Sequence, residues 1–214
     1  MSAREVIVIG AGGHAKVVIE TLRAQGDRVV GLIGTQGDAA VLGAPTIGTD
    51  DDLPRLHAEG LKSAIVAIGD NGRRLTLARR LEGMGFTLVN AVHPHALLSP
   101  SVRLGSGIAI MAGVVINADA AIGDHAIVNT RAGIDHDCRI GEAAHIAPGA
   151  TLAGGVTVGA RAFVGAGSAV IPQIEICADA VIGAGASVVR AILEPGVYVG
   201  APARAHSERK GSGS

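Results

Sequence analysis

A six-residue rhythm of hydrophobic positions runs through the second half of the chain. Every sixth residue from Leu98 to Val188 is Leu, Ile or Val, without a break. The positions are Leu98, Leu104, Ile110, Ile116, Ile122, Val128, Ile134, Ile140, Ile146, Leu152, Val158, Val164, Val170, Ile176, Ile182 and Val188. A short fixed period is typical of a solenoid, and a hexapeptide period indicates a β-helix.

Small residues and glycines also hold fixed places in each six-residue unit. A small or β-branched residue such as Ala120, Ala132 or Ala150 comes four residues after the aliphatic, and Gly often follows it directly. We expect a short flat strand and a sharp corner per unit, with Gly, Asn117 and Asn129 tolerating positive φ at corners. Three units make one triangular coil, so the span predicts about five coils stacked at roughly 4.8 Å.

The N-terminal part follows a different pattern, in which apolar runs alternate with helical spacing. Buried strands are expected at 5–10, 28–33, 64–68 and 86–90. Helices are expected at 15–25, at 71–84 and from near Asp51, with a Gly-rich connection over 34–49. Strands that alternate with helices predict a small parallel sheet.

The chain therefore divides into three segments. Residues 1–92 form a small α/β half-Rossmann domain, 93–206 an all-β parallel β-helix, and 207–214 a flexible polar tail. His93-Pro94 marks the join, and 194–204 is expected to form a capping strand and turn.

Composition narrows the classes of function. Hydrophobic residues make up 48%, yet the aromatic residues are only Phe86, Phe163 and Tyr198, which suits a narrow, regular core of aliphatic side chains. A formal net charge of -1 gives no sign of a nucleic-acid or membrane-surface partner. No apolar run approaches the roughly 20 residues of a membrane span. Without a signal-peptide pattern, we expect a cytoplasmic protein with Cys138 and Cys177 reduced.

The first candidate site is a Gly-rich turn after the first strand. Gly10-x-Gly12-Gly13-His14 is close to a phosphate-binding turn, in which backbone N–H groups and a helix N-terminus hold a diphosphate. The second strand ends without the acidic residue of a dinucleotide site, so a mononucleotide fits better than NAD. A turn used only for packing is the alternative. The segment 71–74, Asn-Gly-Arg-Arg, is either a solvated helix start or a wall of the same pocket.

The second candidate is the corner segment 135–137, Asp-His-Asp. An imidazole with an ordinary pKa of about 6.5, flanked by carboxylates, is a good general base, and either Asp135 or Asp137 could hold its tautomer. A solvated polar corner is the alternative. His145 also points outward but lies on a different edge from His136, so only two subunits could bring these residues together.

Metal and cysteine chemistry are not expected. His57, His93 and His95 lack partners at the spacing of metal ligands, and the chain has no paired Cys motif. Cys138 occupies a small-residue position of the repeat, which favours packing over a role as nucleophile.

Together these features resemble the bacterial nucleotide-sugar N-acetyltransferases of the left-handed β-helix, sialic-acid-O-acetyltransferase-like group. The resemblance extends from Val6 to about Arg204 and is carried by 8–18, 67–71, 93–94, the hexapeptide array, 129–130, 134–137, 141–145 and 200–204. It implies a left-handed β-helix, a homotrimer, acetyl-CoA as the acetyl donor and no metal. The implied acceptor is a UDP-linked or GDP-linked 4-amino-4,6-dideoxy sugar.

The resemblance also implies roles for individual residues. His136 looks like the general base and Asp137 its orienting acid, although many relatives carry Glu there. His145 resembles a contact to the acetyl carbonyl or thioester across the interface, and Asn129 lies near the sugar. The positions that match the acetyl-CoA groove are Gly154, Ala166 and Ala184. Those expected around the diphosphate are Gly12, Gly13 and His14, with Gly69, Asp70 and Asn71 opposite.

One departure from the family pattern leaves the identity of the nucleotide base open. UDP-specific relatives often place Asp-Asp after the second strand, where this chain has Ile33-Gly-Thr-Gln36, so GDP competes with UDP. A sugar O-acetyltransferase of the sialic-acid type, also using acetyl-CoA, is a second hypothesis, and a solenoid without catalysis is a third. The sequence also leaves open whether the N-terminal domain meets its own or a neighbouring subunit's β-helix.

Overall fold

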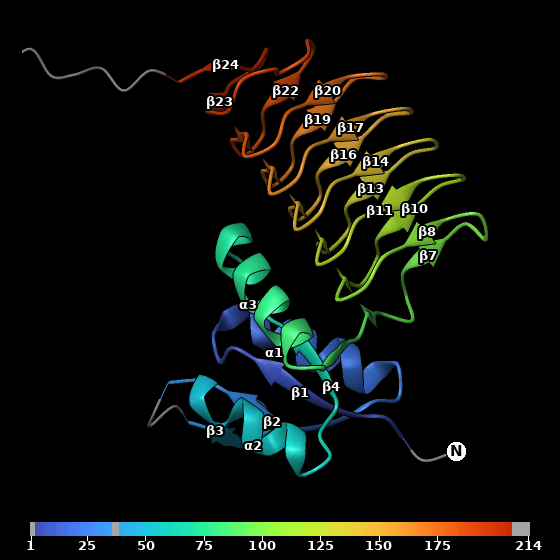
Figure 1. Ribbon diagram of the computed structural model, residues 1–214. Coiled ribbons are helices and arrows are strands. Elements are labelled where there is room, and N and C mark those ends of the chain that lie inside the picture. The colour runs from blue at the N-terminus through green and yellow to red at the C-terminus, as the bar shows by residue number, and fades with distance from the viewer. Residues whose placement is uncertain (1–2, 36–38, 207–214) are drawn as a thin grey trace, which may run out of the picture.

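The computed structural model describes residues 3–35 and 39–206 as a small α/β domain joined to a long β-helix (Figure 1). The expected tail 207–214 and Gln36 lie outside the described residues. In the part of the chain that is described, each helix is too short or too polar to cross a membrane.

A five-stranded parallel sheet organises the N-terminal domain, in the order β3-β2-β1-β4-β5. Its strands are β1 (Glu5–Ile9), β2 (Arg28–Ile33), β3 (Thr46–Gly48), β4 (Ser63–Val66) and β5 (Thr87–Leu88). Helix α1 (Gly13–Ala24) packs on one face. The other face carries α2 (Leu53–Ala58), preceded by the 3-10 turn η1 (Asp50–Asp52), and α3 (Asn71–Gly83).

The predicted alternation of strands and helices is confirmed, but one strand was missed. β3 lies in the segment expected as a connection and pairs with the end of β2 at the sheet edge. It has three half-buried residues, which is too few to produce a periodic apolar pattern.

Strands of two residues, one every six residues, form the β-helix. They are β6 (Ala91–Val92), β7 (Leu97–Leu98), β8 (Arg103–Leu104), β9 (Ala109–Ile110), β10 (Val115–Ile116), β11 (Ala121–Ile122), β12 (Ile127–Val128), β13 (Gly133–Ile134), β14 (Arg139–Ile140), β15 (His145–Ile146), β16 (Thr151–Leu152), β17 (Thr157–Val158), β18 (Phe163–Val164), β19 (Ala169–Val170), β20 (Glu175–Ile176), β21 (Val181–Ile182) and β22 (Ser187–Val188). From β7 on, the second residue of every strand is the predicted aliphatic, and these side chains line the core. The hexapeptide prediction is therefore confirmed.

The strands stack into three parallel sheets, which are the faces of the left-handed β-helix. The docking face runs β21-β18-β15-β12-β9-β6 and meets the N-terminal domain. Beyond β21 it is extended by β23 (Val197–Val199) and β24 (Arg204–Ala205). The second, β22-β19-β16-β13-β10-β7, is the uncharged face, because its outward residues are Leu97, Val115, Gly133, Thr151, Ala169 and Ser187. The third, β20-β17-β14-β11-β8, is the arginine face, which presents Arg103 and Arg139.

The glycines that follow the aliphatics have a different role from the predicted one. Positive φ occurs three residues after the aliphatic, at corner glycines such as Gly113 (φ 71°) as expected, but also at Asp137 (φ 58°). Asn117 and Asn129 do not have positive φ, so the prediction for these two residues is wrong. At Gly141, an added Cβ would lie 2.5 Å from the backbone N of Ala160 in the next coil. The absence of a side chain is needed here because successive coils stack closely, and not for backbone conformation.

The β-helix is covered at its C-terminal end and, near its first coils, on its docking face. At the C-terminal end, β23 (Val197–Val199) adds to β21 and β24 (Arg204–Ala205) pairs antiparallel with β23, which confirms the expected cap. Near the first coils, α1 packs on the docking face of its own chain, and one buried cluster joins Val18 and Ile19 to Met111 and Ile127. The first β-helix strand, β6, begins at Ala91, next to the expected domain boundary.

Candidate active site

A cavity of about 660 Å³ opens at the carboxyl ends of β1, β2 and β4. Its walls are formed by residues 9–14, 33–35, 49–51, 67–69, Arg73 and Leu77. This edge of an open parallel sheet is where ligands of α/β domains bind. Of the residues expected around a diphosphate, Gly12, Gly13, His14 and Gly69 line this one cavity.

The Gly turn leaves the N-terminus of α1 open. Gly12 is the N-cap residue and has no side chain with which to bond the first N–H groups of the helix. A Cβ added at Gly12 or Gly13 would meet nothing within 4 Å, so the space above this helix end is available to a ligand. Gly10 is structural instead, because it has φ 114° and an added Cβ would lie 3.1 Å from the Ala67 carbonyl oxygen. The turn therefore has the geometry of an anion site.

The sequence pattern does not indicate two acidic residues of the cavity wall. Asp50 and Asp51 come from η1, which follows the strand β3 that was not predicted. Asp50 also pairs with Arg80, with 3.4 Å between Oδ2 and Nη1. The acidic run at 50–52 was visible in the sequence, but without β3 nothing indicated that it returns to the edge of the sheet.

The side chains of Asp70 and Asn71 are engaged outside the cavity wall. Asp70 caps α3, because its Oδ1 accepts from the Arg73 N–H at 2.7 Å. Asn71 Nδ2 donates to the carbonyl oxygens of Arg161 (2.8 Å) and Ala162 (3.2 Å) on the β-helix.

His145 belongs to a buried polar cluster beneath the N-terminal domain of its own chain. Its side chain leaves the β-helix as predicted, but the residue is only 8% exposed, and its ring centroid lies 6.4 Å from that of His14. Asn129 Oδ1 accepts from the Thr130 N–H at 2.8 Å, which orients the amide so that Nδ2 donates to His145 Nε2 at 3.2 Å. The His145 proton therefore lies on Nδ1.

This cluster keeps two imidazoles neutral. Burial lowers the pKa of His145 to about 4, with the charge of Arg74 adding to the effect. Burial and Arg74 also lower the pKa of His14 to about 4. His14 Nε2 and His145 Nδ1 are buried without a hydrogen bond of good geometry among the described residues, and the backbone of Gly69 lies beside His145.

His136 occupies an exposed corner between β13 and β14. Its side chain is 61% exposed, and its Nδ1 lies 2.8 Å from Asp137 Oδ2. Asp135 instead accepts the backbone N–H of His136 and an N–H of Asn117, so Asp137 is the acid that contacts the imidazole. The hydrogen bond to Asp137, followed by the charge of Asp135, raises the pKa of His136.

Gly154 makes room for this imidazole. A Cβ at Gly154 would lie 2.6 Å from both Cε1 and Nε2 of His136, so the ring rests over the Gly154 backbone in the next coil. With Nδ1 bonded to Asp137, Nε2 is the nitrogen left to exchange a proton with a substrate.

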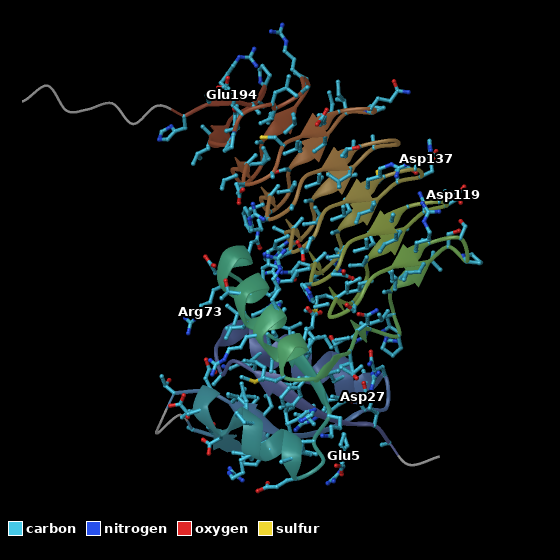
Figure 2. The ribbon with its side chains drawn as sticks, in the orientation of Figure 1. Glu5, Asp27, Arg73, Asp119, Asp137 and Glu194 are labelled. Atoms are coloured by element: carbon cyan, nitrogen blue, oxygen red, sulfur yellow. The ribbon has the colours of Figure 1, made fainter. Side chains whose placement is uncertain are left out.

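The expected site residues fall into separate groups in one chain. His136 and Gly154 lie on the edge between the uncharged and arginine faces. Asn129, Ala166 and Ala184 lie on the edge between the docking and uncharged faces. Figure 2 shows Asp137, beside His136, and Arg73, beside the cavity, on opposite sides of the molecule. A single chain therefore does not bring His136 to the cavity.

The described residues show no cluster of three or more His, Cys, Asp or Glu side chains that could hold a metal ion. Cys138 is buried in the core, and its Sγ lies 3.3 Å from the Ala153 carbonyl oxygen. Burial raises the pKa of this thiol, which makes it a poor nucleophile.

Two families of domains match the chain. The PglD N-terminal domain matches residues 5–81, and the bacterial transferase hexapeptide (six repeats) matches residues 137–171.

Solved structures resemble nearly the whole chain. PerB from Caulobacter crescentus, in complex with CoA and GDP-perosamine, is 54% identical, with a TM-score of 0.92 over 95% of this chain and 97% of that one. The acetyltransferase domain of PglB from Neisseria gonorrhoeae FA1090, in complex with acetyl coenzyme A, is 35% identical, with a TM-score of 0.89 over 95% and 100%.

A curated relative matches a shorter region. UDP-N-acetylbacillosamine N-acetyltransferase from Bacillus subtilis (strain 168) is 40% identical over 117 residues, which are 51% of this chain and 52% of the relative. The match thus spans about half the length of that relative.

Proposed function

The chain belongs to the hexapeptide-repeat nucleotide-sugar N-acetyltransferases, and on this premise we propose that it transfers acetyl from acetyl-CoA to the 4-amino group of a nucleotide-linked 4-amino-4,6-dideoxy sugar. The observation that carries the proposal is a pair of features in one chain. The N-terminus of α1 at Gly12 is open to a ligand, and the imidazole of His136 is hydrogen-bonded to the carboxylate of Asp137. The 54% identity to PerB, crystallised with CoA and GDP-perosamine, supports the choice of reactants. The proposed location of the reaction is the cytoplasm, as expected from the sequence.

The proposed nucleotide is GDP. The cavity wall carries the carboxylates of Asp50 and Asp51. Guanine offers an N–H and an NH₂ group side by side to a carboxylate, whereas uracil offers one N–H, so an acidic wall favours guanine. The diphosphate is assigned to the N-terminus of α1, with Arg73 as a nearby cation.

The proposed chemistry is direct acyl transfer. The amine nitrogen bonds to the thioester carbonyl carbon, and His136 Nε2 takes the amine proton while Asp137 holds Nδ1–H. The C–S bond then breaks, and the proton passes to the departing CoA thiolate. Backbone N–H groups along the groove, near Gly154, stabilise the oxyanion. His145 is not the base in this scheme, because its acceptor nitrogen is bonded to Asn129 and burial holds its pKa near 4.

The proposed assembly is a homotrimer in which neighbouring subunits share each active site. The uncharged face presents no charged side chain from Leu97 to Ser187, whereas the arginine face presents Arg103, Arg139 and Glu175. A closed three-fold assembly through the uncharged face would bring the His136 edge of one subunit beside the neighbour's Asn129 edge and cavity. Acetyl-CoA then lies between two β-helices, against Gly154 of one and Ala166 and Ala184 of the other.

The proposal is tested by thiol release from acetyl-CoA in parallel reactions with GDP-linked and UDP-linked 4-amino-4,6-dideoxyhexoses. We expect rapid release with the GDP-linked sugar and at least about tenfold slower release with the UDP-linked one, since uracil offers fewer hydrogen-bond donors to Asp50 and Asp51. Preference for UDP would contradict the assignment of Asp50 and Asp51. Release with a free sialic acid, and with neither nucleotide sugar, would favour the O-acetyltransferase alternative.

The pH dependence of turnover follows from the environment of His136. The base acts in its neutral form, and its pKa is raised, so kcat/KM should climb with pH to a plateau, with a midpoint above about 6.5. Asp137→Asn removes the largest cause of the raised pKa, so its midpoint should move to lower pH. The measurement is kcat/KM for the nucleotide sugar from pH 5.5 to 9 for both proteins. Identical midpoints would contradict the pairing of His136 with Asp137.

A further inference from the structure

A column of backbone carbonyls lies along the edge between the arginine and docking faces. At this edge the N–H of Ala143 bonds to the Asp124 carbonyl (2.7 Å), and the N–H of Arg161 to the Glu142 carbonyl (2.8 Å). The backbone hydrogen bonds between coils are therefore accepted by the carbonyl of the residue that precedes each corner residue, here Asp124 and Glu142. The carbonyls of His125, Ala143 and Arg161 themselves, one in each of three successive coils, are left for another donor.

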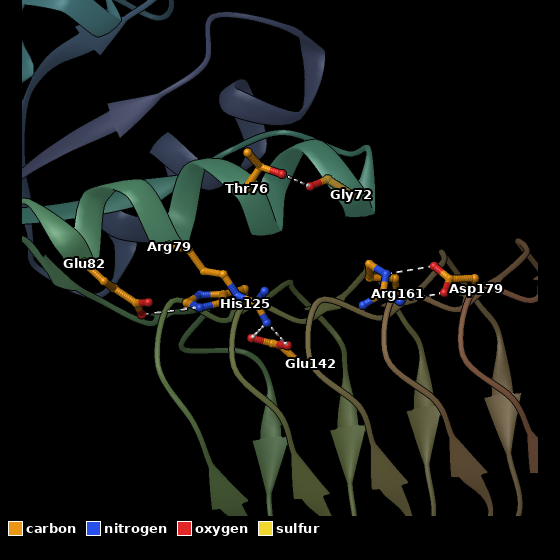
Figure 3. A network of polar contacts seen from close by, with 8 residues as sticks. All are labelled: Gly72, Thr76, Arg79, Glu82, His125, Glu142, Arg161 and Asp179. Carbon is orange, nitrogen blue, oxygen red and sulfur yellow. Dashed lines mark hydrogen bonds and ion pairs between the residues drawn. The ribbon is translucent and has the colours of Figure 1, made fainter.

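Two side chains of α3 bond to all three of these carbonyls. Arg74 Nε donates to His125 at 2.8 Å and Nη2 to Ala143 at 2.6 Å, while Asn71 Nδ2 donates to Arg161 at 2.8 Å. The two residues are three apart, so they share one face of the helix. Figure 3 shows α3 running along this edge, with the coils turning beneath it.

The same guanidinium also holds the wall of the cavity. Arg74 Nη1 donates to the carbonyls of Ile68 (3.0 Å) and Gly69 (3.1 Å), two residues that line the cavity. The second N–H of Nη2 donates to Asn71 Oδ1 at 2.8 Å. All five N–H donors of Arg74 are thus used, and the residue is 1% exposed.

The acceptors of this buried cation are neutral. Among the described residues its hydrogen-bond partners are four backbone carbonyls and one amide, and no carboxylate. Burial lowers the pKa of Arg74 to about 10, against the opposing charge of Asp70, so it stays protonated at neutral pH. A buried cation is costly unless its bonds are well placed, and a Lys ammonium cannot reproduce the planar fork.

We propose that Arg74 and Asn71 are positioning residues that fix which coil of the β-helix lies beside the cavity. They thereby set the position along the β-helix axis at which the amine of a bound sugar meets the acetyl donor. The inference deepens the proposed function and rests on it. A slip by one coil would move the sugar by roughly 4.8 Å along the β-helix. Acyl transfer tolerates errors of about 1 Å, so this register matters more for turnover than for binding.

The test compares Arg74→Lys and Asn71→Ala with Arg79→Ala. Arg79 lies on the same helix and reaches the same edge, but only through an exposed ion pair with Glu142 at 3.0 Å. We expect each of the first two variants to lower kcat at least about tenfold, with the Kd for GDP and the KM for acetyl-CoA within about threefold of wild type. Arg79→Ala should match wild type. Unchanged kcat in both variants, or joint loss of turnover and GDP binding, would overturn the inference.

A second measurement needs no substrate. Hydrogen–deuterium exchange of the backbone over 67–72 should accelerate in Arg74→Lys and Asn71→Ala, while exchange in the β-helix strands and in Arg79→Ala stays at the wild-type rate. Unchanged exchange over 67–72 in both variants would overturn the inference that Arg74 and Asn71 hold this segment against the β-helix. If the wild-type protein acetylates no nucleotide sugar, the proposed function fails by itself, and exchange alone decides whether these residues hold the loop.

Discussion

Replacing His136 with Ala is expected to lower kcat by about 10²–10⁴-fold, the usual contribution of a positioned general base. The protein should stay folded, because the His136 side chain is 61% exposed and the core beneath it is formed by Ile134 and Cys138. Nucleotide binding should also survive, since the cavity lies on the other side of the chain (Figure 2). The measurements are kcat from thiol release and the Kd for GDP by calorimetry.

A matched control comes from another exposed histidine. His95 is exposed near the start of the β-helix, so His95→Ala should keep wild-type turnover. A His136→Ala enzyme with kcat within a few-fold of wild type would remove His136 from the mechanism. Equal loss in both variants would point to general damage rather than to loss of a base.

Three histidines near the proposed reaction differ in environment, and the difference separates their roles. His14 and His145 are held neutral by burial and by Arg74, and the acceptor nitrogen of His145 is bonded to Asn129. His136 is exposed, bonded to Asp137 through Nδ1, and has a raised pKa. Of the three, His136 thus combines an available Nε2 with the basicity needed to accept a proton. The sequence placed all three in a candidate site but could not rank their basicity.

The β-helix was predictable because its fold depends on one aliphatic residue in every six. An aliphatic at each second strand position fills the core, and the local corner repeats, so the pattern survives without long-range information. The role of the glycines was not predictable from local sequence. At Gly141 the constraint comes from the backbone of Ala160 in the next coil, a contact that exists only after stacking.

The candidate site was predictable where its geometry is local. The turn at Gly12 and the pair His136 and Asp137 each lie within a few residues of their structural cause. Arg74 could not be assigned, because its partners His125 and Ala143 lie 51 and 69 residues away. Its role depends on the matching of a helix to a β-helix edge, which no sequence pattern records.

Mixing two inactive variants is expected to restore activity if neighbouring subunits share the site. His136→Ala destroys the base but leaves the cavity intact. Gly12→Asp should abolish diphosphate binding in the cavity. A carboxylate at this N-cap accepts hydrogen bonds from the helix N–H groups and repels a diphosphate. An added Cβ at Gly12 meets nothing within 4 Å, so this variant should fold normally.

Co-expressed in equal amounts, the two variants should recover about a quarter of wild-type turnover, because each shared site needs an intact His136 from one subunit and an intact cavity from the next. The control is a mixture of His136→Ala and His136→Asn, which should stay inactive because both variants lack the general base. Failure of the first mixture to regain turnover, with mixed trimers present, would mean that each chain completes its own site. The N-terminal domain would then have to move to reach His136, against the bonds that Arg74 and Asn71 make to three coils.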